Sequence, residues 1–206
     1  GIRQTAPDLS EFFLGPLLIG GAMIFWLLFL HLVVCRDRLP SLGLGPGRWV
    51  ADLAVGVALG AGLLMLKHVS DPWLAGLFPR RPPTPEIVQL IRVVAADPWL
   101  LALWLGPVVW LGVAAFEELW RVFVLHRLWS LFPGRAGAWS VVLMVSVLIG
   151  FAHGYQGPAG GVSIAAKSVL MGAYFMTARR LVPLIVAHAV YDSVQIAMAA
   201  WALRGQ

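Results

Sequence analysis

The sequence predicts an all-α fold, a polytopic transmembrane helical bundle with about six spans. Of the 206 residues, 60% are hydrophobic and only 12% are charged, whereas a soluble domain is about 45–50% apolar and about 25% charged. The mean hydropathy is +0.83. A single core in water cannot bury this much apolar surface, so the chain is expected to be an integral, multi-pass membrane protein.

Six apolar runs are candidate spans, since a span needs about 20 mostly apolar residues. They cover approximately residues 13–34, 50–69, 99–132, 138–154, 160–178 and 181–203. After the second run, the Pro-rich stretch DPWLAGLFPRRPPTPE is expected to be irregular, because proline interrupts helices. Residues 87–96 are predicted to form a short interfacial helix. The third helix ends in the amphipathic turns VFVLHRLW, which are expected at the membrane interface.

The net charge of +5 indicates membrane orientation and not a nucleic-acid partner. Arg residues occur singly or in pairs at the ends of apolar runs, the pattern of topology signals, and no basic stripe with interleaved aromatics is present. The Arg-bearing loops after the first, third and fifth helices share one side, which is expected to be cytoplasmic, with the N-terminus outside. Lys67, Arg80, Arg81 and Arg92 lie on the opposite side and weaken this bias.

Ionisable residues inside the apolar runs indicate a functional site. Glu117 and Glu118 lie together in AAFEELWR, His153 ends SVLIGFAH, and His188 and Asp192 lie in IVAHAVYD. Such side chains in hydrocarbon cost several kcal/mol unless they are paired, hydrated or functional. At about 1.5 Å per residue from the cytoplasmic helix ends, they lie about 10–22 Å deep. Helix tilt can reconcile these depths, so the helices are expected to converge on one polar site.

Spacing along the helices predicts which side chains share a face. Glu117 and Arg121 are i and i+4, as are His188 and Asp192. Glu118 is turned about 100° from Glu117, so one glutamate is expected to line the site and the other to be structural, paired with an Arg. Three further histidines near helix ends are interpreted as interfacial or hydrogen-bonded residues: His31, His68 and His126. A single lysine inside the fifth helix, Lys167, is expected to snorkel to the interface.

The motifs EELWR, IGFAH and HAVYD resemble, in order, those of the CPBP family (CAAX protease and bacteriocin-processing, also called Abi), which are glutamic-type intramembrane endopeptidases. That family pattern is a Glu pair followed by Arg, then Phe-x-x-x-His, then His-x-x-x-Asn/Asp, and the resemblance covers roughly residues 105–199. Ile149 stands where the family has Phe, and Asp192 stands where Asn is common. Arg121 follows Glu118 by three residues where four are usual. Glu118 is expected to support the catalytic residues, with Arg121 as its candidate partner.

The resemblance implies hydrolysis of a peptide bond in a membrane-associated or C-terminally anchored protein. Residues 98–206 would form the CPBP-like catalytic core, and residues 1–97 the N-terminal membrane helices and the Pro-rich loop of the same integral membrane domain. The expected partners are a membrane protein or peptide substrate and the lipid bilayer, and the oligomeric state is not predicted. Abundant Arg, Ala, Gly and Trp favour a prokaryotic protein of the cytoplasmic membrane, which argues against prenylated substrates.

The resemblance also implies roles for individual residues. Glu117 and His153 would activate water, and a Glu in an apolar pocket can act first as base and then as acid. His188 and residue 192 would stabilise the oxyanion. Because an ionised Asp192 would repel an oxyanion, Asp192 is expected to act indirectly, by orienting His188.

Two alternatives remain open at this level. In a zinc protease, Glu117, His153 and His188 would be the ligands and water would take the fourth position. However, no HExxH motif is present, and the single cysteine Cys35 excludes a thiolate pair, so no cofactor is expected. A non-catalytic scaffold or proton-coupled transporter would also use buried Glu and His, but no inverted repeat is evident.

Overall fold

All described elements are helices. The computed structural model describes residues 9–78 and 82–204. Within these ranges, six helices are long and apolar enough to cross a membrane. They are Phe12–Val34, Trp49–Leu77, Pro98–Trp129, Gly134–Ala152, Gly154–Ala178 and Val182–Leu203. The predicted all-α fold with about six spans is confirmed.

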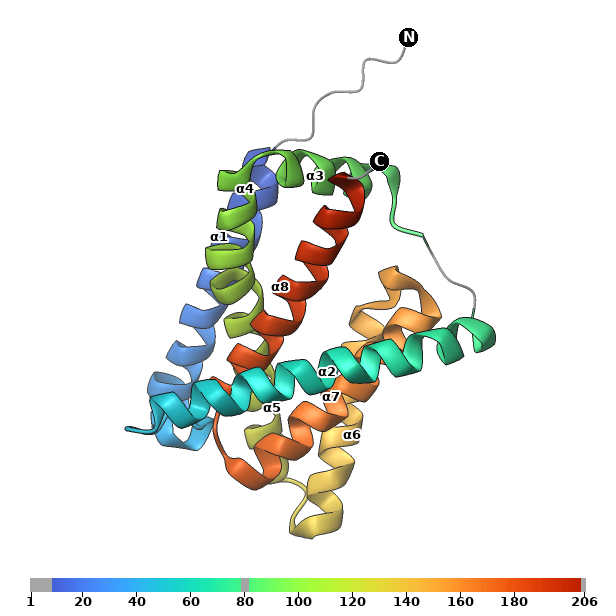
Figure 1. Cartoon of the computed structure of the whole chain (residues 1–206). Helices are drawn as coiled ribbons and strands as arrows, with labels where there is room; N and C mark the ends of the chain where they lie inside the picture. The colour runs from blue at the N-terminus through green and yellow to red at the C-terminus, as the bar shows by residue number, and fades with distance from the viewer. Residues whose placement is uncertain (1–8, 79–81, 205–206) are drawn as a thin grey trace.

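The elements form a helical bundle (Figure 1). α8 packs against α2, η3 and α3, while α6 packs on α7 and α1 on η3. Their bounds are α1 (Leu9–Phe29), the π-helix η1 (Leu30–Val34), the 3-10 turn η2 (Leu39–Leu42), α2 (Trp49–Leu77), α3 (Pro85–Ala96), α4 (Pro98–Leu103), the π-helical η3 (Trp104–Ala115), α5 (Phe116–Trp129), α6 (Gly134–Ala152), the 3-10 turn η4 (Gly154–Gln156), α7 (Gly157–Ala178) and α8 (Val182–Arg204). α3 lies across one end of the bundle, as expected for an interfacial helix.

The second span is longer than predicted. α2 continues through Pro72 to Leu77, so the segment DPWLAGL is helical, and the prediction of an irregular chain there was wrong. Proline removes one intrahelical donor, but irregular backbone exposed to lipid would leave several groups unsatisfied. A Lys67–Asp71 ion pair one turn apart also supports the helix just before the proline. Residues 79–81 of the Pro-rich stretch lie outside the described residues.

The third span is interrupted, whereas one continuous helix was predicted. At Gly106 the backbone leaves helical geometry, with φ −92° and ψ −108°. Pro107 disfavours the α conformation at the residue before it, and glycine tolerates the result. α5 begins after the π-helical stretch, with Glu117 and Glu118 in its first turn. The other predicted boundaries lie within about one helical turn of the observed ones.

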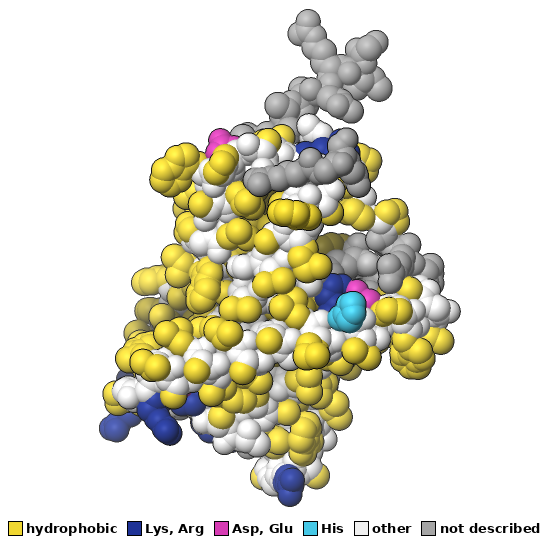
Figure 2. Space-filling model, viewed as in Figure 1, with side chains coloured by type: hydrophobic (Ala, Val, Ile, Leu, Met, Phe, Trp, Pro, Cys, Tyr) yellow, Lys and Arg dark blue, Asp and Glu magenta, His cyan; other side chains and the backbone are white. Residues whose placement is uncertain are grey.

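The three Arg-bearing loops lie together at one end of the bundle, as predicted, where α1, α5 and α7 end (Figure 1). Lys and Arg side chains gather at this end in Figure 2. Arg180 forms an ion pair with the buried Asp52 of α2, and the Leu181 N–H donates to the Gly43 carbonyl at 3.2 Å. A Cβ on Gly43 would lie 2.7 Å from the Leu181 nitrogen, and its φ is +78°, so glycine fits this contact. The cytoplasmic assignment of this end stays a prediction.

A hydrogen-bonded cluster fastens the turn after α1 to α5. The buried His31 accepts an N–H from Arg127 at Nδ1, 3.0 Å away. Because Arg only donates, the His31 proton sits on Nε2, which lies 3.1 Å from the Arg38 carbonyl. Asp37 accepts from His126 at 2.9 Å and from Arg127 at 3.4 Å. His31 and His126 are therefore hydrogen-bonded, as predicted.

This cluster makes stability depend on pH through Asp37. The hydrogen bonds from His126 and from the Arg38 N–H hold the pKa of the Asp37 carboxyl well below its usual range. Its ionised form therefore stabilises the fold above about pH 4, and that contribution is lost as the pH falls below this value. Asp37→Asn is expected to cost about 0.5–1 kcal/mol near neutral pH. In thermal unfolding, the difference from the wild type should shrink toward about pH 3, and a difference independent of pH would contradict this role of Asp37.

Candidate active site

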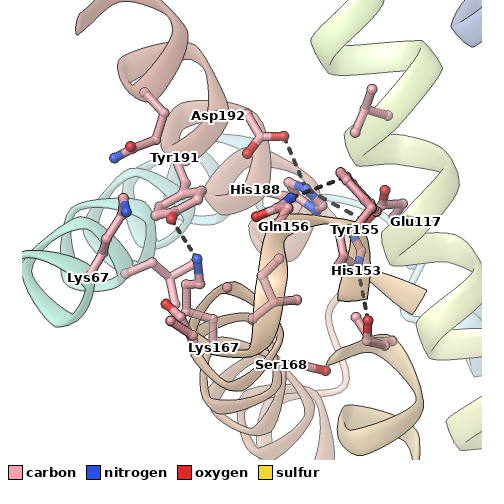
Figure 3. Close-up of a pocket in the computed structure, with 18 of the residues that line it drawn as sticks. Lys67, Glu117, His153, Tyr155, Gln156, Lys167, Ser168, His188, Tyr191 and Asp192 are labelled. Carbon is pink, nitrogen blue, oxygen red and sulfur yellow. Dashed lines mark hydrogen bonds and ion pairs between the residues drawn. The ribbon is translucent and has the colours of Figure 1, made fainter. Parts of the chain in front are cut away.

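A large cavity of about 890 Å³ lies between α2, α5, α7 and α8. It contains side chains from three separate sequence motifs, which the bundle brings to one place (Figure 3). The six predicted catalytic and supporting residues all line it, namely Glu117, Glu118, Arg121, His153, His188 and Asp192.

Glu118 is the structural member of the glutamate pair. Its side chain is fully buried, and its two oxygens accept from Arg121 Nε at 2.8 Å and Nη2 at 3.1 Å. Such two-point contacts are the stronger kind of ion pair. Arg121 also donates to the hydroxyl of Ser168 and, at 3.4 Å, to its carbonyl. The pair thus joins α5 to α7, and Arg121 takes the partner expected for Glu118.

His188 lies between carboxylates. Its Nδ1 is 2.8 Å from Glu118 Oε1, while its Nε2 is 3.3 Å from Asp192 Oδ2 and 3.9 Å from Glu117 Oε2. A carboxylate already bonded to a guanidinium accepts hydrogen bonds and does not donate them, so Nδ1 carries a proton. Nε2 is directed to the cavity. Both ring nitrogens therefore have an acidic acceptor.

Glu117 lies on the cavity side of α5. Its side chain is 29% exposed, against 0% for Glu118, as the turn of about 100° between neighbouring helical residues requires. Figure 3 shows Glu117 directed toward His188. One glutamate is thus available to a molecule in the cavity, while the other is committed to the protein interior.

His153 caps α6 and does not lie inside it, because α6 ends at Ala152. Its Nδ1 is 2.9 Å from the Ile149 carbonyl oxygen. A carbonyl only accepts, so this nitrogen carries the proton and Nε2 can accept. The ring lies beside Tyr155, with centroids 5.8 Å apart. Within residues 9–78 and 82–204, His153 makes no hydrogen bond or ion pair with Glu117 or His188.

The proposed zinc ligands do not form a metal-binding group. In the part of the chain that the structure describes, no three His, Cys, Asp or Glu side chains are arranged to hold a metal ion. Glu117, His153 and His188 line the same cavity without forming such a group. Cys35 is exposed directly after η1, and it does not line the cavity.

Lys167 and Tyr191 extend the site beyond the residues found from the sequence. The prediction that Lys167 snorkels to the interface was wrong. Its Nζ donates to the Tyr191 hydroxyl at 2.5 Å and lies 4.2 Å from the centre of that ring, and both residues line the cavity. The available signals were a cation in the middle of a span and a tyrosine inside the motif HAVYD.

The fold and the site define a multi-pass membrane protein whose spans enclose a cavity that contains one histidine between carboxylates. Residues 98–194 match the family model described as Type II CAAX prenyl endopeptidase Rce1-like. The chain therefore carries a domain of the CAAX protease family, a family of membrane proteases, and the resemblance inferred from the three motifs is confirmed. The comparisons with curated proteins and with solved structures gave no match.

Substitution of one member of the buried Glu118–Arg121 pair is expected to cause a large and specific loss of stability. Glu118→Leu leaves the Arg121 guanidinium buried without its carboxylate, which is expected to cost about 3–5 kcal/mol. The double variant Glu118→Leu/Arg121→Met removes both charges and should recover most of that loss. Unfolding in detergent measures both, with Glu117→Gln as the control that changes stability by less than about 0.5 kcal/mol. A double variant no more stable than Glu118→Leu would contradict the charge pairing.

Proposed function

We propose that this protein hydrolyses a peptide bond in a membrane-associated or C-terminally anchored protein, with residues 98–206 as its catalytic core. The observation that carries this proposal is the meeting of Glu117, His153 and His188 in one cavity of a CAAX protease domain. In this proposal the chemistry is of the glutamic type, the enzyme needs no metal cofactor, and it acts in a prokaryotic cytoplasmic membrane.

Glu117 is the proposed general base. Its carboxylate lies in the cavity and has no Arg or Lys within 4.0 Å among the described residues, so it is free to take a proton from water. His153 presents Nε2 as a second acceptor, because Nδ1–H is held by the Ile149 carbonyl. The water oxygen attacks the carbonyl carbon, and the proton taken by Glu117 passes to the leaving nitrogen as the C–N bond breaks.

His188 is the proposed donor to the oxyanion. Glu118 fixes the ring through Nδ1–H, and the opposite nitrogen is directed to the cavity. A ring that has carboxylates at both nitrogens can donate from both. Asp192 lies 3.3 Å from Nε2 and orients that N–H, so it acts through His188 and not on the carbonyl oxygen. Fixed donors of this kind lower the barrier because they need no reorganisation during the reaction.

Substitution of each glutamate by alanine tests the assignment of Glu117 as the general base. Glu117→Ala should lower the rate of cleavage by at least about 10²–10⁴-fold, while its unfolding transition stays near that of the wild type. Glu118→Ala should lose both activity and stability, since it removes the partner of Arg121. The substrates are membrane reporters anchored close to the C-terminus by an S-prenyl cysteine or by a transmembrane helix. Full activity in purified Glu117→Ala protein would rule out the base assignment.

Metal dependence is tested separately. The purified, active protein should contain no stoichiometric metal and should keep its activity in a chelator titration, because Glu117 and His153 suffice to activate water. Stoichiometric zinc, with activity lost on chelation and restored by zinc, would overturn the glutamic mechanism. A folded, metal-free protein that cleaves none of the reporters would favour the non-catalytic alternative.

A further inference from the structure

The end of the bundle where α1, α5 and α7 end, which we call the basic end, carries a surplus of positive charge (Figure 2). Its exposed Arg side chains are Arg36, Arg38, Arg48, Arg135 and Arg179. Among the described residues, none of these five has a carboxylate oxygen within 4.0 Å. The carboxylates of this end, Asp37 and Asp52, are already in ion pairs with other side chains. An anion that balances the surplus therefore comes from outside the chain.

Arg179 differs from the other four because its guanidinium is held in place by aromatic rings. Its Cζ lies 4.2 Å from the centre of the Trp129 ring and 5.9 Å from that of Phe175. These two rings are stacked, with centroids 5.8 Å apart, and Trp129 also donates to the Ala138 carbonyl at 3.3 Å. A cation over a ring face is attracted to it, so the rings of α5 and α7 fix the position of this charge.

The backbone at Arg179 has a conformation that favours glycine. Arg179 follows α7 with φ +53° and ψ +42°, in the left-handed region, and its N–H donates to the Phe175 carbonyl at 3.0 Å. Many helices end on glycine in this conformation, because other residues are strained there. A topology signal needs only the charge of an Arg, which a neighbouring, unstrained position would also supply. The strain therefore indicates a function for the Arg179 side chain itself.

The hydrogen-bond donors of the Arg179 guanidinium are free. No acceptor in the described part of the chain bonds to them. The carbonyls that end α7 also attract a cation, but within residues 9–78 and 82–204 none of them accepts from this side chain. The planar fork of an Arg matches two oxygens of a phosphate group. A fixed guanidinium with free donors is thus a preformed site for a phosphate.

The site lies at the level of lipid headgroups. α5 and α7 belong to candidate spans that end at Trp129 and Ala178, next to the site, and tryptophan itself is typical of the membrane interface. Leu131 and Phe132 follow Trp129 and are exposed, at 68% and 45%, so apolar side chains adjoin the aromatic platform. A zwitterionic headgroup would bring a cation to the surplus Arg residues, whereas an anionic headgroup would not. The chemistry of the site therefore suits an anionic phospholipid.

We propose that Arg179, held over Trp129, binds the phosphate of an anionic phospholipid at the basic end of the bundle. The phosphate oxygens accept charge-assisted hydrogen bonds from the guanidinium, and the acyl chains lie along exposed apolar side chains such as Leu131 and Phe132. Neither Arg179 nor Trp129 lines the cavity. The lipid site is therefore independent of the proposed hydrolysis and of its outcome.

The test measures lipid binding to the purified full chain in detergent micelles by native mass spectrometry. The probes are dioleoylphosphatidylglycerol and dioleoylphosphatidylcholine, which share their acyl chains and differ in headgroup charge. The wild type is expected to bind phosphatidylglycerol at least about 5-fold more tightly, which is the effect of one Arg near an anionic lipid surface. Equal affinity for the two lipids, or no binding of phosphatidylglycerol, overturns the proposal.

Variants then assign the binding to Arg179. Arg179→Gly should lower the affinity for phosphatidylglycerol by about 10–100-fold, the range for charged hydrogen bonds. Its unfolding temperature without lipid should not fall, since glycine favours this backbone conformation. Arg179→Lys should keep part of the affinity, because an ammonium lacks the planar fork. Trp129→Leu should lower the affinity, and Trp129→Phe, which keeps a ring under the charge, should restore most of it.

The matched control is Arg135→Gln, which removes an exposed Arg of the same end that has no aromatic partner among the described residues. It should lower the affinity by at most about 5-fold. Equal losses in Arg135→Gln and Arg179→Gly would indicate diffuse attraction by the basic end and would refute the site. If Arg179→Gly does not fold, Arg179→Gln takes its place with the same expected loss. An affinity that is unchanged in every folded variant of Arg179 also overturns the proposal.

Competition distinguishes a lipid phosphate from a soluble one. Inorganic phosphate and glycerol 3-phosphate are added in large excess, against sodium chloride of the same ionic strength. Both are expected to leave phosphatidylglycerol bound, because neither has acyl chains to bury against the protein. Displacement of the lipid from the wild type by inorganic phosphate, but not by sodium chloride, would assign Arg179 to a soluble anion and would refute the lipid site.

Discussion

The burial of the Arg121 guanidinium is the constraint on which the site depends. A charge inside the spans must have its donors satisfied, and this requirement uses both oxygens of Glu118 and the hydroxyl of Ser168. Glu118 Oε1 also accepts from His188 Nδ1. One buried cation therefore fixes α5, α7 and α8 relative to each other and sets the orientation of the histidine ring in the cavity.

Neighbouring carboxylates in this protein have different surroundings and therefore different chemistry. Glu118 is surrounded by hydrogen-bond donors. Moving its side chain away would leave the buried charge of Arg121 without a partner. Glu117, one residue earlier, lies in the cavity 3.9 Å from His188 Nε2. Asp192 is closer to that nitrogen, at 3.3 Å, and belongs to the same helix as the ring. Glu118 and Asp192 therefore hold the His188 ring, whereas Glu117 is free to contact water.

The break between α6 and α7 lies beside the cavity. α6 ends at Ala152, and His153 caps it and lines the cavity. The chain turns into α7 at Gly157, where φ is +85°, a value that favours glycine. Irregular backbone at membrane depth is tolerated where it borders protein or a polar cavity. The cavity therefore permits the early helix end that brings the His153 ring to the site.

Apolar run length determined the six spans, since each run had to cross the hydrocarbon, and the motif order alone indicated the protease family. The turn of about 100° per residue also separated Glu117 from Glu118. The sequence did not predict the helix through Pro72, the kink at Gly106 or the inward direction of Lys167. Periodicity places a side chain around its own helix axis, but the partner of that side chain depends on which neighbouring helix packs there. The tertiary structure alone therefore decided that Lys167 contacts Tyr191 in the cavity.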